Sequence, residues 1–166
     1  MPRVALFDPC YLQALRPGDA DCARRVLEAL GDTVTLIDGR CCGQPAFNSG
    51  FRKEARAVGR QLLRAARAHA AVVTTSGSCT AMVRHYLPTL WEPPRSAAAA
   101  VIASRFVDFP TYVARHPALE RLGLRLPGVV ALHESCHSRR ELGASAAVAA
   151  LLARVEGLEV REPAFA

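Results

Sequence analysis

Two adjacent cysteines, Cys41 and Cys42, followed by Gly43, are the residues of this chain whose types and spacing point most directly to chemistry. On a strand, neighbouring side chains point to opposite faces, so two consecutive thiols are hard to explain by packing. In a loop, both sulfurs can turn toward one ligand, and thiolates are the ligands that hold iron–sulfur clusters. The pair therefore predicts a metal centre whose other ligands lie elsewhere in the chain.

The other candidate ligands also follow predicted strands, which are short apolar runs rich in β-branched residues. The predicted strands are residues 3–7, 33–37, 71–75 and 129–132, and they are followed by Cys10, by Cys41 with Cys42, by Cys79 and by Cys136. In a reducing compartment, cysteines are more often metal ligands or catalytic thiols than partners in disulfides. Cys10, Cys41, Cys42 and Cys79 together supply four thiolates, which is enough for a cluster.

Amphipathic segments that predict helices alternate with these strands. The predicted helices are residues 19–30, 52–68, 80–90, 103–115 and 145–155. The alternation predicts an α/β fold of parallel, Rossmann-like βαβ units. Ligands of such sheets bind outside the carboxyl ends of the strands, where we expect the strand-end cysteines to gather. Cys22 differs, because it lies on the apolar side of the helix at 19–30, and we expect it to pack there.

An internal repeat organises the chain. Residues 4–10 have an echo at 130–136, and at the same offset of 126 positions Gly31 falls on Gly157 and Val34 on Val160. The repeat predicts one cysteine-rich domain at residues 1–125 and the first part of a second, incomplete copy at 126–166. A second cysteine pair would fall at position 167, just beyond Ala166. Cys136 is expected to belong to that second site.

The order of these motifs resembles the cysteine-rich CCG domain, in which a lone cysteine, a Cys-Cys-Gly and a helix-opening cysteine succeed one another. This domain occurs twice in heterodisulfide reductase, in the glycolate oxidase iron–sulfur subunit and in lactate utilization protein A. The segments 41–50, 76–80 and 133–137 are most similar to the lactate utilization branch of the family. The chain departs from the heterodisulfide reductase motif at Met82, where that motif has its last cysteine.

The resemblance implies an iron–sulfur electron-transfer subunit of an oxidoreductase complex that oxidises L-lactate to pyruvate. It implies a [4Fe-4S] cluster, of cubane or non-cubane shape, at the four cysteines of the first copy. The implied partners are a ferredoxin-type iron–sulfur subunit and a third lactate-utilization protein. A subunit of the glycolate oxidase or heterodisulfide reductase type is the alternative within the family. No residue stands out as an acid, base or nucleophile, so a non-catalytic or co-catalytic subunit is expected.

Three alternatives to an iron–sulfur subunit stay open. A zinc-stabilised interaction module would use the same four thiols, although the Cys-x₂₋₄-Cys spacing typical of structural zinc is absent. The segment from His133 to His137 matches H-E-x-x-H, which needs both histidines on one helix face, whereas the repeat predicts a loop there. A Cys–His hydrolase built on Cys79 or Cys136 would leave the paired cysteines unexplained.

The amino-acid composition limits the expected location of the protein and the kinds of partner that it binds. Hydrophobic residues make up 51% of the chain, no run of about 18 apolar residues exists, and a signal peptide is not recognisable, so a cytoplasmic protein without a membrane span is expected. The net charge of +6 comes almost entirely from arginines, which are spread along the chain, so no nucleic-acid partner is expected. Five arginines, Arg52, Arg56, Arg60, Arg64 and Arg67, form a ridge on one predicted helix. Such a ridge is most often a solvated face, and a dock for an acidic redox partner is the alternative.

Overall fold

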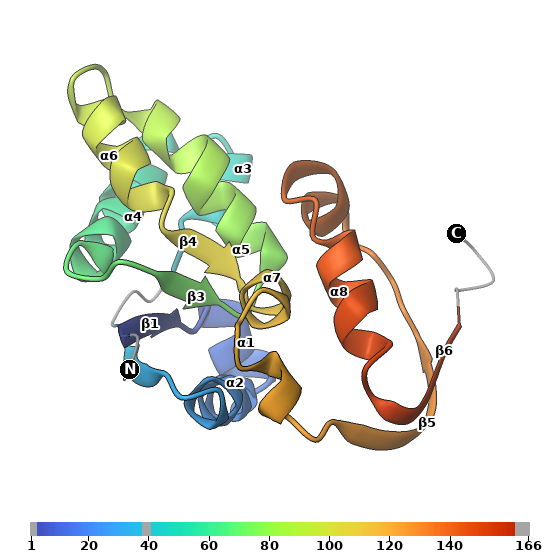
Figure 1. Cartoon of the computed structure of the whole chain (residues 1–166). Helices are drawn as coiled ribbons and strands as arrows, with labels where there is room; N and C mark the ends of the chain where they lie inside the picture. Colours follow the sequence, from blue (N-terminus) through green and yellow to red (C-terminus); the bar gives the residue numbers. More distant parts are fainter. Residues whose placement is uncertain (1–2, 38–40, 162–166) are drawn as a thin grey trace.

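A parallel four-stranded sheet with helices on both faces forms the body of the computed structural model, which describes residues 3–37 and 41–161 (Figure 1). Its strands are β1 (Arg3–Phe7), β2 (Thr33–Leu36), β3 (Val72–Thr74) and β4 (Phe106–Asp108), in the order β2-β1-β3-β4. All three neighbouring pairs run parallel. The Rossmann-like α/β fold expected from the alternating pattern is confirmed.

Strand β1 is buried on both faces because it lies inside the sheet. Val4 and Leu6 point into one core cluster, and Ala5 and Phe7 point into the other, as the two-residue period of a strand requires. All four are at most 1% exposed. The first cluster is closed by α2 (Asp19–Ala29) and α7 (Phe109–Ala114), and the second by α4 (Arg52–Ala66) and α6 (Arg95–Ala103). An unbroken apolar run is therefore what this position demands.

Short helical turns join these elements. They are α1 (Cys10–Leu15), α3 (Gln44–Asn48), α5 (Gly77–Ala81), the π-helical turn η1 (Met82–Tyr86), and the 3-10 turns η2 (Leu87–Leu90) and η3 (Leu119–Arg121). The single helix predicted at 80–90 is thus three successive turns. Cys10, which follows β1, begins α1, with Pro9 at the N-cap.

The helix predicted at 103–115 is wrong, because this stretch contains β4 and then α7. Phe106 is fully buried and meets Phe7 edge to face at 6.5 Å, so tertiary packing decides the conformation of this three-residue strand. The Asp108 side chain then accepts a hydrogen bond from the Thr111 N–H at 3.0 Å and caps α7. Asp108 followed by Pro110 was the available signal for a helix start, since proline is favoured in the first turn.

A second, two-stranded parallel sheet pairs β5 (Arg125–Ala131) with β6 (Glu156–Arg161). Between them lie the π-helical turn η4 (His137–Glu141) and α8 (Ser145–Leu152), and α8 packs beside α7 (Figure 1). Val4 pairs with Val34 in the first sheet, and Val130 pairs with Val160 in the second, which is the same register at the offset of the repeat. The domain boundary near residue 125 stays a prediction.

Both faces of the second sheet are largely exposed. Leu126, Val129 and Val160 are 56%, 55% and 41% exposed, and α8 contains no buried residue, although Leu151 packs against the first domain's core. None of the described helices is long and apolar enough to cross a membrane.

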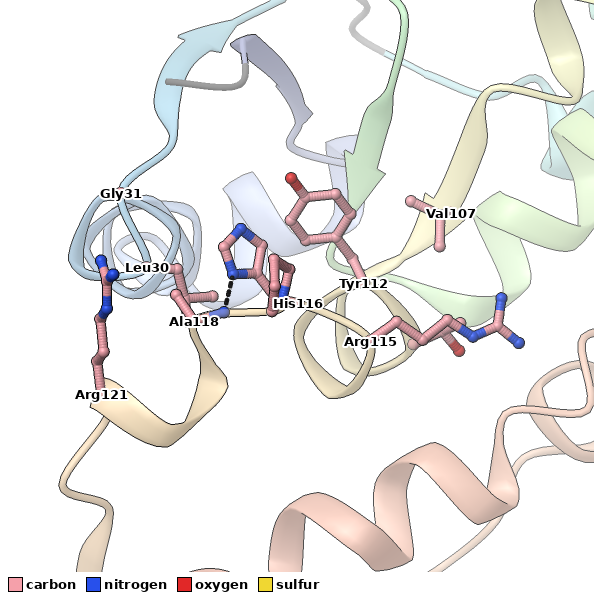
Figure 2. A pocket seen from close by; sticks show the side chains of 10 residues that line it. Leu30, Gly31, Val107, Tyr112, Arg115, His116, Ala118 and Arg121 are labelled. Carbon is pink, nitrogen blue, oxygen red and sulfur yellow. Dashed lines mark hydrogen bonds between the residues drawn. The ribbon is translucent and has the colours of Figure 1, made fainter.

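A buried polar cluster joins α7 to the start of β2. The Asp32 side chain is fully buried, and the Tyr112 hydroxyl donates a hydrogen bond to its Oδ2 at 2.8 Å. His116 Nε2 lies 3.4 Å from Oδ1, while His116 Nδ1 accepts a hydrogen bond from the Ala118 N–H at 3.1 Å (Figure 2). Burial, followed by the bond to Asp32, raises the pKa of Tyr112 above its ordinary value.

Replacing Tyr112 by phenylalanine is expected to lower the free energy of unfolding by about 1–2 kcal/mol, because a buried carboxylate oxygen loses its donor. Urea denaturation measures this change. Tyr11→Phe is the matched control, since Tyr11 is 43% exposed. Equal midpoints and slopes for the two variants would show that the hydroxyl of Tyr112 contributes nothing.

Candidate metal centre

The order of the strands creates one crevice at the carboxyl edge of the sheet. From β1 the chain crosses to β2 on one side and then returns to β3 on the other, so the crossovers diverge between β1 and β3. Ligand sites of open α/β sheets form at this switch point, outside the carboxyl ends of the strands. Cys10 follows β1 and Cys79 follows β3, while Cys41 and Cys42 follow β2.

Cys10, Cys41, Cys42 and Cys79 lie near one another at this edge of the sheet. Cys42 Sγ is 3.2 Å from Cys79 Sγ, within the distance of a hydrogen bond between thiols. The Cys41 thiol lies close enough to Cys42 and to Cys10 for both side chains to shift its pKa. The four thiols are therefore neighbours in the order 10, 41, 42, 79, with Cys42 and Cys79 in direct contact.

The four thiols differ in burial. Cys42 and Cys79 are 2% and 3% exposed and share a core cluster with Met82, whereas Cys10 and Cys41 are half-buried. Met82, the departure from the heterodisulfide reductase motif, is fully buried in this cluster. Cys42 and Cys79 are thus shielded from solvent, whereas Cys10 and Cys41 are accessible to a ligand.

The remaining two cysteines lie outside the cluster. Cys136 is exposed, just before η4. Cys22 is also exposed, so the expectation that it packs is wrong. Ala23 and Leu27 on α2 and Leu30 just after it are buried, and Cys22 lies beside this stripe on the solvent side.

The contacts among these thiols give the cysteines different pKa values. The hydrogen bond from Cys42 lowers the pKa of Cys79, and contact with Ser76 helps to keep it below its ordinary value although burial opposes this. For Cys42, the bond with Cys41 lowers the pKa, but the bond with Cys79 and burial outweigh it and raise the pKa to about 12. The bond to Cys42, with burial, raises the pKa of Cys41. Cys79 is thus the thiol of the four that loses its proton most readily, and a nearby cation would favour loss of the other protons.

Local backbone geometry places the inner pair. Gly43 has a φ of 85°, and its N–H donates a hydrogen bond to Cys41 Sγ at 3.4 Å. A Cβ at Gly43 would lie 3.0 Å from the Ala55 carbonyl oxygen on α4. Ser76 caps α5 by accepting the Cys79 N–H at 3.3 Å. Glycine is therefore required after the pair, both for its conformation and for the close approach of α4.

The start of the second copy covers this site. Gln44 Nε2 lies 2.9 Å from His137 Nε2, so the amide donates to the ring nitrogen in this arrangement. The Tyr86 hydroxyl donates to Glu141 Oε1 at 2.9 Å, and Ser138 lies directly against Gly77. These contacts hold η4 over α3, α5 and η1. Sequence reasoning missed them, because nothing in the chain marks which surface a turn about 90 residues away will contact.

The H-E-x-x-H segment does not form the helix that a zinc protease needs. Residues 132–135 have no regular structure, and η4 begins only at His137. His133 is exposed, while His137 is engaged with Gln44. The two histidines thus do not share one helix face, as the repeat predicted.

Four thiols are the right type of ligand for a metal group, although Cys42 Sγ and Cys79 Sγ lie closer together than two metal-bound sulfurs do. Within residues 3–37 and 41–161, no three His, Cys, Asp or Glu side chains are already spaced around a metal ion. Two sulfurs that bind one tetrahedral ion at about 2.3 Å each lie about 3.8 Å apart. The 3.2 Å contact of Cys42 and Cys79 must widen by about half an ångström to admit metal, a small adjustment for sites that metal binding organises.

A cavity of about 530 Å³ lies away from the thiols. It is lined by the end of α2 and by α7 with the following loop, including Leu30, Tyr112, His116 and Arg121 (Figure 2). None of the six cysteines lines it. It is therefore separate from the candidate metal centre.

Gly43→Ala is expected to destabilise the fold by about 2 kcal/mol, combining a left-handed backbone with a close contact to Ala55. Gly50→Ala is the control, because Gly50 has a φ of 83° and open space around it. The difference between their free energies of unfolding isolates the Ala55 contact. If the two variants unfold alike, α4 does not approach the Cys-Cys-Gly loop this closely.

Thiol labelling of the metal-free protein is expected to follow burial. With a maleimide at neutral pH, Cys22 and Cys136 should react at least about tenfold faster than Cys42, whose modification requires local opening. Peptide mass spectrometry over a time course resolves each site. Labelling of Cys42 as fast as Cys136 would contradict the cover that η4 provides.

Comparison with known proteins places these features in a family. The model of the CCG cysteine-rich domain matches residues 4–84, which contain the four clustered cysteines. Lactate utilization protein A of Macrococcus caseolyticus is 34% identical over 163 residues, covering 96% of this chain and 66% of that protein. Proteins of the same name from Bacillus thuringiensis and Bacillus cereus are 32% identical over 162 residues, covering 96% of this chain and 68% of theirs. No solved structure matches the chain.

The similarity to these relatives extends beyond residues 4–84. The matched region takes in 96% of the chain and so includes most of the second copy, whereas the chain spans about two thirds of the length of these curated relatives. The chain belongs to the CCG cysteine-rich family, among the relatives of lactate utilization protein A.

Proposed function

We propose that this protein is an iron–sulfur electron-transfer subunit of an oxidoreductase complex. The convergence of four thiols at the switch point of the sheet is the observation that supports it most strongly. Cys10, Cys41, Cys42 and Cys79 would hold the cluster, and Cys136 would serve a second site of the same kind. Four thiolates are the usual ligand set of a [4Fe-4S] cluster, and a non-cubane form would use the adjacent pair.

A bound cluster would supply reversible one-electron chemistry, and the chain's own residues would set the conditions for it. Burial of Cys42 and Cys79 removes water from the inner side, and η4 packs beside the site against Gln44 and Tyr86. The Gly43 N–H donates to Cys41 Sγ, and hydrogen bonds to sulfur raise the potential of such centres. His137 and Glu141 are engaged with Gln44 and Tyr86, which suits a cover better than an acid–base pair.

We propose that the physiological reaction is the oxidation of L-lactate to pyruvate. The support for this proposal is the name of the relatives, lactate utilization protein A. The proposed partners are a ferredoxin-type iron–sulfur subunit and a third lactate-utilization protein, which would contribute the substrate site. Six cysteines without a disulfide suit the reducing cytoplasm, where we place the protein.

Structural zinc is the second candidate, because four thiols are also a common zinc ligand set. The protein would then be an interaction module whose metal stabilises the fold and carries no electrons.

Anaerobic reconstitution with iron and sulfide tests the proposal. The expected result is visible charge-transfer absorption with matching iron and acid-labile sulfide, because four thiolates converge on one place. Cys42→Ser and Cys10→Ser should lose most of the bound iron. Cys22→Ser should retain it, because Cys22 is exposed and outside the cluster. Circular dichroism of each variant shows that loss of metal is not loss of fold.

Two results would overturn parts of the proposal. Colourless protein that carries stoichiometric zinc without sulfide, before and after reconstitution, would establish the zinc module instead. Equal loss of iron in Cys22→Ser and Cys42→Ser would refute the ligand set.

A further inference from the structure

A groove of about 380 Å³ lies between α4 and α6, which run side by side (Figure 1). Its rim carries four arginines: Arg60 and Arg64 from α4, Arg67 at the C-cap of α4, and Arg95 from α6. All four are exposed. Its floor is apolar and is built from Leu63, Trp91, Ala98, Ala99 and Ile102. The groove therefore combines a cationic rim with an apolar floor.

The positive charge of the rim is not neutralised by the surrounding part of the fold. Among the described residues, none of the four arginines forms an ion pair within 4.0 Å, whereas Arg24, Arg139 and Arg154 elsewhere do. No acidic residue of the described ranges lines the groove, and Glu92, which is near in sequence, is not part of the lining. Clustered charges of one sign in a recess concentrate counter-ions and attract partners of opposite sign.

The apolar floor offers a place for one bulky side chain. Leu63 and Ala99 are 6% and 7% exposed, so they close the bottom of the groove, and Trp91 is half-buried beside them. Trp and Arg are the residue types most enriched where binding energy concentrates at protein interfaces. A ligand that is anionic throughout would leave this floor unused.

We propose that the groove docks an acidic segment of a partner protein that inserts one large apolar side chain beside Trp91. The length of the rim supports a peptide segment over a compact anion. Arg60 on α4 and Arg67 at its C-cap are seven residues apart, which is about 10 Å along the helix axis. Carboxylates spaced along a chain match that length, whereas a single phosphate reaches one end of it. Docking depends on these charges and does not require the metal centre.

Trp91 is the single tryptophan of the chain, so its fluorescence reports on this groove alone. The probe is a short glutamate-rich peptide with one central leucine, titrated into the full chain at low salt. We expect saturable change in Trp91 emission, weakened by added salt because the contacts are exposed. Arg60→Glu with Arg64→Glu should weaken binding by about tenfold or more. Replacing the leucine of the probe by serine should also weaken it.

The matched control is Arg25→Glu with Arg140→Glu, which changes the net charge equally at exposed positions on α2 and η4. This variant should bind the probe about as well as the original chain. Equal weakening by both double variants would show attraction to net charge alone and overturn the proposal. Tighter binding of ATP than of the peptide would also overturn it, in favour of a nucleotide site. Because no metal is added, the result is independent of the iron–sulfur assay.

Discussion

Burial of β1 on both faces is the constraint on which the candidate site depends. Val4 and Leu6 fix one layer of helices, Ala5 and Phe7 fix the other, and β2 and β3 must then pair on opposite edges of this strand. That arrangement brings three strand ends to one edge of the sheet. The thiols meet because an apolar strand occupies the centre, and no cysteine needs to attract another during folding.

The close packing of the sulfurs has a consequence for metal binding. Thiols that hydrogen-bond to one another share their protons, and the raised pKa of Cys42 opposes the charge that ligation needs. A cation reverses this balance, so binding of metal and loss of protons proceed together. The contacts of η4 with Gln44 and Tyr86 mean that the second copy takes part in the environment of the first site. The two copies are therefore coupled through a surface as well as by sequence.

Local sequence patterns correctly predicted the features of the fold that depend on residues close together in the chain. The strand-end positions of Cys10, Cys42 and Cys79 follow from apolar runs, and the repeat offset relates the observed pair Val4–Val34 to the pair Val130–Val160. Strand β4 could not be predicted, because three residues carry too little pattern and Phe106 is placed by its contact with Phe7. The exposure of Cys22 depends on how α2 is oriented against the sheet, and the packing of η4 depends on a contact between distant segments. Periodicity carries neither kind of information.

Helix α4 links the two surfaces of the molecule that carry charge or chemistry. Its inner stripe, including Leu62 and Ala66, belongs to the core cluster that contains Cys42 and Cys79, and its backbone at Ala55 lies against Gly43. Its outer face carries the arginine ridge. A helix of fifteen residues held firmly on one side is a rigid support, so charges on its outer face keep fixed spacing. The strong segregation of apolar and charged residues along α4 thus serves packing of the thiol loop and presentation of the groove at once.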